Sequence, residues 1–502
     1  MNTFPADSDE LESFSNAATR IYGNRFFPDQ TLYEYLIEFL LIFVSEKTPE
    51  SGSMRFHEEQ DKDADGKWIY YVTPRMGLKR FIFYDKSKRR TTAKIDDVAY
   101  HKMLKVIMDK IYATSESEKN DIVEAMQDLL HGYAVVIKKR TWCAQALLPI
   151  CKEFVLCEAM PNYKYRQGLD WNNTERIKID MGFDFDKRNY LARGGELYYL
   201  HILQGLDHDK KNTLEKQLSE LLNKQCSKIS EIAGFIESTW ETSQGFDEHQ
   251  LKQRLKLSVI PATGYDICGK YAVDELINYL SSSLDPIKRI ETLAKGVMFQ
   301  VMRMLNARTY DYLNLPEKKW IIDMGGKGEN QVKKIASQWF CDMENDFLTA
   351  INREVKSQEE ARNEVEDENN VLSKVREGKN SSLEILISKG KEIQCIIPVS
   401  GPYTRFTLSE DVTTFLVLSM IHPGEKMTFN MFLKKLYDHF GLIIGPDEYK
   451  KSISNNEGMS DLLCNDFVEN SMAFQDYLES TGFLRELSDA TSLVVNPYKD
   501  MD

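Results

Sequence analysis

Apolar residues recur every three or four positions along most of this chain, which is the period of an α-helix with one buried face. The clearest case begins at Thr428, whose hydroxyl suits an N-cap, and ends before Gly441. Its apolar residues are Phe429, Phe432, Leu433, Leu436 and Phe440. Because strand-like stretches are short and few, the sequence predicts a mainly α protein with small β elements.

Other stretches extend this helical reading. Helices dominate from 250 to 314, and the same period predicts helices over about 30–44, 96–112, 118–130, 192–206 and 210–242. The stretches WIYYVTP and LKRFIFYD, in contrast, alternate like strands. Residues 330–371 predict one long helix, whose stretch REVKSQEEARNEVEDENN has almost no apolar face. Such a helix is typical of a solvated connector.

The C-terminal part of the chain contains the most legible series of elements. A helix that starts near Ser409 is followed by the helix after Thr428 and by one that Asn470 is expected to cap and Gly482 to close. The stretches FLREL, SDAT and SLVV then predict a hairpin. Several helices followed by a hairpin resemble a winged-helix domain, over about residues 405–498.

The charge of this winged-helix-like segment argues against DNA as its ligand. From Lys391 to Asp502 it holds 9 Lys and Arg against 17 Asp and Glu, whereas a winged helix that reads DNA presents basic and amide side chains. The outward positions of its last helix and its wing tip carry the acidic residues Glu469, Asp476, Glu479 and Asp489. We therefore expect the segment to dock a protein; the alternative is a domain that only completes the core.

A chain of 502 residues has room for about three domains, and 42% hydrophobic residues provide for real cores. Composition divides it into four segments. They are an N-terminal α+β domain with a basic hairpin (1–165), a helical middle domain (166–329), a long charged helix with a linker (330–390) and an acidic winged-helix-like domain (391–502).

A cluster of basic residues stands out in this otherwise acidic chain, whose net charge is -14. Aromatic residues interleave with it, and cations beside aromatic rings can hold a nucleic-acid backbone and stack its bases. The alternatives are a solvated hairpin tip and a surface that docks an acidic partner. The candidate nucleic-acid-binding residues are Lys79, Arg80, Lys86, Lys88, Arg89, Arg90 and Lys94.

Four acidic residues, Asp180, Asp184, Asp186 and Glu196, are the candidates for catalysis. Clustered carboxylates hold magnesium in nucleases, where the metal activates water. Their spacing matches no metal-site pattern, and a surface turn followed by a helix is the favoured interpretation. None of the eight cysteines forms a C-x-x-C pair, so a structural zinc site is not expected. The sequence predicts no cofactor and no other metal site.

The chain is expected to be cytoplasmic and not to enter a membrane. Its acidic, polar beginning does not resemble a signal peptide. The best membrane candidate, from Phe39 to Val44, is far shorter than the roughly 20 residues that a span requires.

Three stretches of this sequence resemble a known class of proteins. They are KKRTWCAQALLPICKEFVLCEAMPN, RNYLARGGELYYLHIL and FQDYLESTGFLRELSDATSLVVNPY. They are similar to large accessory proteins encoded beside ATPases or helicases in bacterial phage-defence and DNA-modification-dependent restriction islands. The resemblance implies a non-catalytic subunit of a DNA-directed complex, which docks an ATPase, helicase or nuclease partner.

Two other functions stay open. One is a metal-dependent nuclease that uses the four carboxylates. The other is a bridging subunit similar to the kleisins of SMC-type complexes, which also place helical and winged-helix ends around a charged connector.

Overall fold

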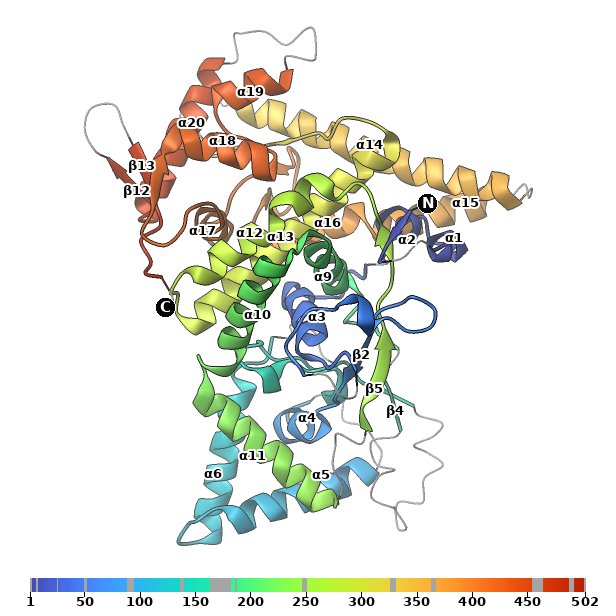
Figure 1. The fold of residues 1–502 in the computed structure, drawn as a ribbon, viewed down its shortest axis with the longest axis vertical. Helices are drawn as coiled ribbons and strands as arrows, with labels where there is room; N and C mark the ends of the chain where they lie inside the picture. The colour runs from blue at the N-terminus through green and yellow to red at the C-terminus, as the bar shows by residue number, and fades with distance from the viewer. Residues whose placement is uncertain are drawn as a thin grey trace. The chain divides into compact units, whose positions relative to one another are not determined.

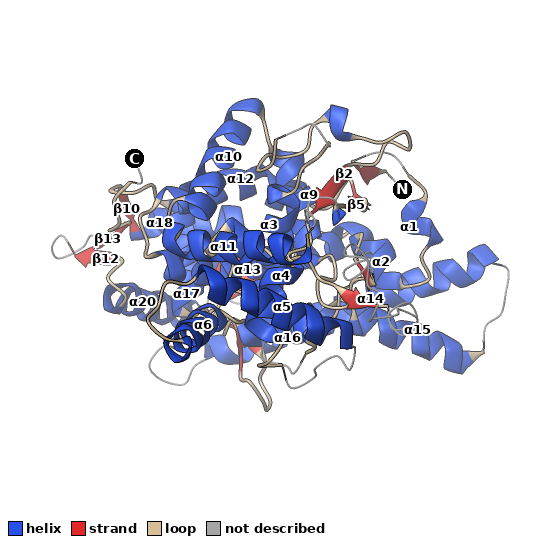
Figure 2. Cartoon of the chain, turned by 90° about the horizontal axis from the view of Figure 1, so that it is seen from below, coloured by secondary structure: helices blue, strands red, loops and turns tan. Residues whose placement is uncertain are grey.

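The computed structural model describes residues 2–5, 8–24, 26–48, 52–87, 94–135, 140–162, 182–185, 187–245, 251–325, 331–362, 367–453, 464–486 and 492–500. Helices account for most of this structure, and the strands are short and scattered (Figure 2). The prediction of a mainly α protein with small β elements is confirmed.

The chain forms two compact units, each assembled from separated stretches. Unit 1 comprises residues 1–28, 197–217 and 258–502, and unit 2 comprises 29–196 and 218–257. The sequence, in contrast, suggested four consecutive segments. Helices α9 (Gly194–Gly205) and α10 (His208–Asn223) each contribute residues to both units.

Unit 2 contains the helices predicted near residues 30–44, 96–112 and 118–130. The first of them begins at Leu32 and is capped by Thr31, whose backbone N–H donates to the Glu34 carboxylate at 2.7 Å in a capping box. Strands β2 and β5 pair antiparallel, with Tyr70 opposite Leu255. The elements are α3 (Leu32–Val44), β2 (Ile69–Val72), α4 (Met76–Phe83), α5 (Lys94–Lys110), α6 (Glu116–His131), β3 (Met160–Pro161), β4 (Phe183–Asp184), α11 (Ser227–Gln244) and β5 (Gln253–Lys256).

Two predictions for this unit are wrong. The stretch LKRFIFYD is not a strand, because most of it forms helix α4, and all eight residues of α4 are buried. With only eight residues, α4 is too short for its helical period to stand out in the sequence, and its apolar run with interspersed charges imitated a strand. The helix predicted over 210–242 is two helices, α10 and α11, separated at residues 224–226.

Helix α13 (Pro286–Leu313) lies in the core of unit 1 and contacts α2, α12, α14, α16 and α17. The Asp285 side chain caps its start by accepting from two backbone N–H groups, and Pro286 occupies the first turn. Asn314, in the left-handed region at φ 58°, ends it. Helix α17 approaches closely at Gly296, where a Cβ atom would lie 2.2 Å from the Phe415 ring.

The long charged helix α14 (Gln331–Arg362) is not the solvated connector that its composition predicted. One of its faces is buried in unit 1, and α15 (Glu368–Asn380) lies alongside it (Figure 1). The charged stretch near its end concealed this face, which consists of Val332, Ala336, Phe340, Met343, Phe347, Ala350, Ile351 and Val355.

The remaining elements of unit 1 precede the C-terminal part of the chain. Strand β1 pairs antiparallel with β6, and β8 pairs antiparallel with β9. The elements are β1 (Thr3–Phe4), α1 (Glu10–Ser13), α2 (Ala17–Tyr22), β6 (Ile260–Pro261), α12 (Asp266–Ser281), β7 (Trp320–Ile321), α16 (Leu383–Glu392), β8 (Ile396–Ile397) and β9 (Arg405–Phe406).

The C-terminal part contains helices packed against a three-stranded antiparallel sheet in the order β10-β13-β12. The predicted hairpin is present as β12 and β13, and β10 adds a third strand. Strand β11 pairs in parallel with β7. The elements are α17 (Glu410–Met420), β10 (Lys426–Thr428), α18 (Phe429–Phe440), β11 (Leu442–Ile443), α19 (Pro446–Ile453), α20 (Cys464–Ser480), β12 (Leu484–Glu486) and β13 (Ser492–Val495).

Asn470 does not cap a helix, contrary to expectation, because it lies inside α20. Its side-chain amide is buried and donates to the carbonyl oxygens of Ile322 and Ile444, both at 2.9 Å. Its Oδ1 accepts from the backbone N–H of Met324. Asn470 therefore fastens α20 to the segments that follow β7 and β11.

Candidate functional site

Two of the predicted nucleic-acid-binding residues, Lys79 and Arg80, are buried in unit 2. The Lys79 ammonium donates to the carbonyl oxygens of Cys143 at 2.8 Å and Cys157 at 2.6 Å. Burial lowers the pKa of this lysine. Neither residue reaches the surface, so their assignment to a nucleic-acid site is wrong. Their positions in α4 turn both side chains inward.

Arg80 forms an interior ion pair with Asp96 of α5. The Arg80 Nη2 and Asp96 Oδ1 atoms are 2.8 Å apart, and neither side chain is exposed. The guanidinium carbon also lies 4.6 Å from the ring centroid of Trp142 and 4.6 Å from that of Trp240. This arrangement organises the core of unit 2.

The other basic candidates divide into two groups. Lys86 and Lys94 are exposed, and Lys86 forms an ion pair with Asp128. Lys88, Arg89 and Arg90 lie outside the described residues. The part of the nucleic-acid hypothesis that stays a prediction is thus limited to residues 86–94.

The acidic candidates for catalysis do not form an open carboxylate cluster in the described part of the chain. Asp184, in β4, forms an ion pair with Lys187 at 3.1 Å. Glu196 is buried and bound to two arginines. Asp180 and Asp186 lie outside the described residues. No group of three or more His, Cys, Asp or Glu among the described residues is placed to hold a metal ion.

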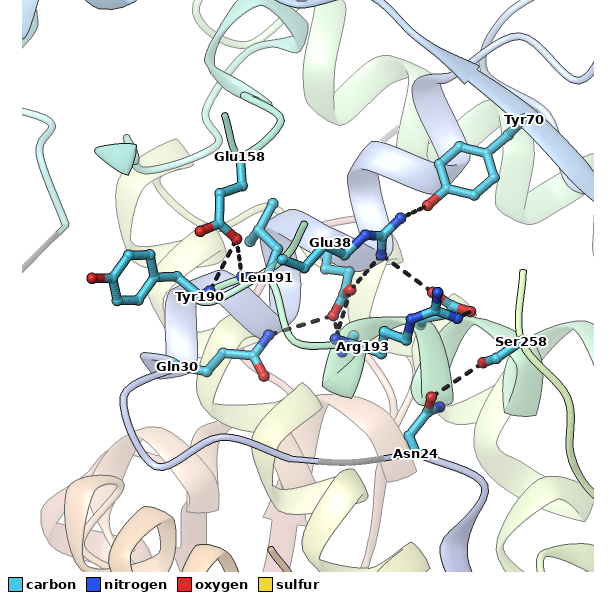
Figure 3. Close-up of polar contacts among 12 residues, drawn as sticks. Asn24, Gln30, Glu38, Tyr70, Glu158, Tyr190, Leu191, Arg193 and Ser258 are labelled. Atoms are coloured by element: carbon cyan, nitrogen blue, oxygen red, sulfur yellow. Dashed lines mark hydrogen bonds and ion pairs between the residues drawn. The ribbon is translucent and has the colours of Figure 1, made fainter. Parts of the chain in front are cut away.

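Glu196 belongs instead to an ionic network of unit 2, which we define as Glu38, Tyr70, Arg188, Arg193 and Glu196 (Figure 3). All of these side chains are buried or nearly so except that of Arg193, which is 41% exposed. The Arg188 Nη1 atom lies 3.1 Å from Glu38 Oε1 and 3.3 Å from Glu196 Oε2. Its other terminal nitrogen donates to the Tyr70 hydroxyl. Arg193 pairs with the second Glu196 oxygen at 3.4 Å. Two carboxylates therefore share one interior guanidinium.

Glu38, from α3, also binds the backbone where α9 begins. Its two carboxylate oxygens accept from the N–H groups of Arg193 at 2.9 Å and Gly195 at 2.8 Å. Burial raises the pKa of Glu38 to about 7, and the neighbouring Glu196 carboxylate adds to the rise, while Arg188 opposes it. Glu38 is thus an interior group that changes its charge near neutral pH.

Glycines let the start of α9 approach α3 closely. A Cβ atom at Gly194 would lie 2.1 Å from the Tyr35 ring, and one at Gly195 would lie 2.1 Å from the Tyr35 carbonyl oxygen. Arg193 just before them adopts a positive φ of 67°. The paired glycines are visible in the sequence as ARGGE, but no sequence pattern identified Glu38 as the residue that binds the backbone at this point.

A third carboxylate anchors the same segment. One Glu158 oxygen accepts from three successive backbone N–H groups, of Asn189, Tyr190 and Leu191, at 2.9–3.0 Å. Figure 3 shows the contacts to Tyr190 and Leu191. The Arg140 guanidinium, paired with Glu34, lies 3.6 Å from the centroid of the Tyr190 ring. Residues 188–196 are therefore held by buried acids and an arginine, which is the arrangement of a structural element rather than of an open reaction site.

The predicted protein-binding residues lie on one side of α20 in unit 1. The buried positions of this helix are Phe467, Asn470, Phe474 and Leu478. Glu469, Asp476 and Glu479 are exposed on the opposite side, and Asp489 lies outside the described residues.

Apolar side chains share this exposed side with the acidic residues. Val468 is 43% exposed and Met472 is 56% exposed. The described residues include no ion-pair partner for Glu469, Asp476 or Glu479. We call these five residues the acidic face of α20. The same helical period that predicted the buried side could have identified Val468 and Met472.

Comparison with protein families, with curated proteins and with solved structures found no match. Within the described residues, every helix is too short or too polar to cross a lipid bilayer.

Proposed function

We propose that this protein is a non-catalytic subunit that binds a protein partner through the acidic face of α20. The observation that carries the proposal is the combination of exposed Val468 and Met472 with three carboxylates that lack ion-pair partners in the described structure. Exposed apolar side chains rimmed by charge mark protein-binding surfaces. The winged-helix-like character of residues 405–498 is part of this proposal, and the element order α17, β10, α18, β11, α19, α20, β12, β13, in which helices precede a closing hairpin, supports it.

Charge indicates the chemistry of the partner. Carboxylates on this face would repel the phosphates of DNA, whereas they complement lysine and arginine side chains. We infer a basic amphipathic helix of another protein, whose apolar side rests on Val468 and Met472. The resemblance of the sequence to defence-island accessory proteins supplies the partner class, an ATPase, helicase or nuclease subunit.

Site-specific photo-crosslinking in cells tests the proposal. A photoreactive residue at position 472 should give a discrete protein adduct. The same residue at Leu372, which is 61% exposed on α15, is the matched control and should not give that adduct. Identical adducts at both positions, or none at 472, would contradict the proposal.

The adduct partner, once purified, allows a quantitative test. Asp476→Lys with Glu479→Lys should weaken its binding by at least about tenfold, because two favourable contacts become repulsive. The control is Asp121→Lys with Glu124→Lys, exposed acidic residues of α6 at the same spacing, which should leave the affinity nearly unchanged. Equal effects of the two double variants would mean that general charge, and not this face, determines binding.

A further inference from the structure

Unit 1 contains a cavity of about 410 Å³ beside the end of α13. Helices α14, α18 and α19 and the segment between α13 and β7 supply its walls. This volume lies in the range of small-molecule sites. The residues that characterise the cavity, which we call the lysine pocket, are Lys318, Lys319, Lys451, Trp339 and Tyr437, and Leu315 lies at its rim. Glu317 also lines the cavity, and its carboxylate accepts from the side-chain amide of Asn306.

Strand pairing brings these groups together. The parallel pairing of β7 with β11 places Trp320 opposite Leu442, directly after α18. Lys319 therefore lies beside the last turn of α18, which carries Tyr437. Helix α19 contributes Lys451, which lies against the same ring.

Three ammonium groups lie against aromatic rings in this pocket. Lys319 Nζ is 4.6 Å and Lys451 Nζ is 4.5 Å from the centroid of the Tyr437 ring. Lys318 Nζ is 4.9 Å from that of Trp339. The rings hold the lysines in place, and such cation–π contacts stabilise a positive charge without neutralising it.

The carboxylates of the described structure leave one of these charges without an ion pair. Lys318 lies 3.7 Å from both Asp342 and Asp346, and Lys451 lies 3.1 Å from Asp438. Lys319 has no such partner among the described residues, and its hydrogen bond to the Tyr437 carbonyl oxygen is long, at 3.4 Å. Burial lowers its pKa, with Glu317 opposing the change. A bound anion would compensate this half-buried charge.

We propose that the lysine pocket binds a small organic phosphate. Phosphate suits the pocket because its several oxygens can accept from more than one ammonium group, and lysine binds it as a point charge. The exposed side chain of Leu315 and the neighbouring Pro316 at the rim offer an apolar surface for the organic part. This site lies apart from the acidic face of α20 in sequence and in chemistry, and its role does not depend on the proposed function.

Titration calorimetry of the full chain tests this site, with ADP and inorganic pyrophosphate as probes at constant ionic strength. Both should bind, and Lys319→Met should weaken binding at least about tenfold, as expected for loss of a charged hydrogen bond. Lys451→Met, at a more exposed position, should weaken it in the same direction. Lys434→Met changes an exposed lysine of α18 outside the pocket and should have little effect.

The outcomes separate cleanly. Binding of ADP more tightly than pyrophosphate would show that the rim contacts the organic part. If neither ADP nor pyrophosphate binds at millimolar concentration, the proposal is overturned. Equal losses in the Lys319→Met and Lys434→Met variants would also overturn it, because binding would then reflect general charge. Thermal unfolding of each variant checks that Lys319→Met folds, and Lys451→Met decides the matter if it does not.

Discussion

Replacement of Asp96 by Asn should destabilise unit 2 strongly, because it removes the carboxylate that pairs with buried Arg80. Neither side chain of this pair is exposed, so water cannot replace the lost partner. Breaking a buried ion pair from one side costs about 3–5 kcal/mol. The adjacent Asp97→Asn is a matched control in the same turn of α5, and its 57% exposed side chain should cost about 0.5 kcal/mol or less.

Hydrogen exchange measured by mass spectrometry reports this difference locally. Peptides from α4 and α5 give the opening free energy around the pair, which a single unfolding curve of a two-unit chain would not. The double variant Arg80→Met with Asp96→Asn should recover much of the loss, since it leaves no buried charge. Equal protection in Asp96→Asn and Asp97→Asn would refute the reasoning that the pair is buried.

Two further predictions concern the ionic network. Because the pKa of Glu38 is raised to about 7, the folded state keeps a proton that the unfolded state loses above about pH 4.5, so stability falls as the pH rises toward 7. Glu38→Gln should remove up to about 3 kcal/mol of this pH-dependent change in stability. Hydrogen exchange of residues 188–196 at pH 5 to 8 measures the change, and the same pH dependence in the variant would contradict the prediction. Gly195→Ala should lower the melting temperature by several degrees, because the added Cβ atom clashes with the Tyr35 carbonyl oxygen. Gly234→Ala is the control: open space surrounds this position of helix α11, so the melting temperature should stay unchanged or rise. Equal melting temperatures of the two variants would argue against the close approach of α9 to α3.

The sequence predicted elements well where one face of a helix is buried and the other is wet. Helices α5, α6 and α18 begin and end within a few residues of their expected bounds, because apolar period and capping residues agree there. The fold class follows from the same signal.

The sequence did not predict which charged side chains are buried where their ion-pair and hydrogen-bond partners lie far away along the chain. Lys79 and Arg80 looked like surface charges because their partners, the Cys143 and Cys157 carbonyls and Asp96, are far away in sequence. The charged end of α14 similarly concealed a buried face. The network around Glu38 joins residues about 150 positions apart, and no local pattern reveals such a pairing.

The composition of unit 1 from separated stretches has a consequence for synthesis on the ribosome. All residues of unit 2 have been translated once the chain reaches Leu257. Helix α2, in contrast, packs against α14 and α15, and the Tyr22 hydroxyl bonds to Thr309, so these N-terminal residues emerge roughly 300 positions before their partners. During that interval Ala17, Ala18 and Ile21 are an uncovered apolar segment of the kind that chaperones retain, so α2 reaches its final place only long after its own translation.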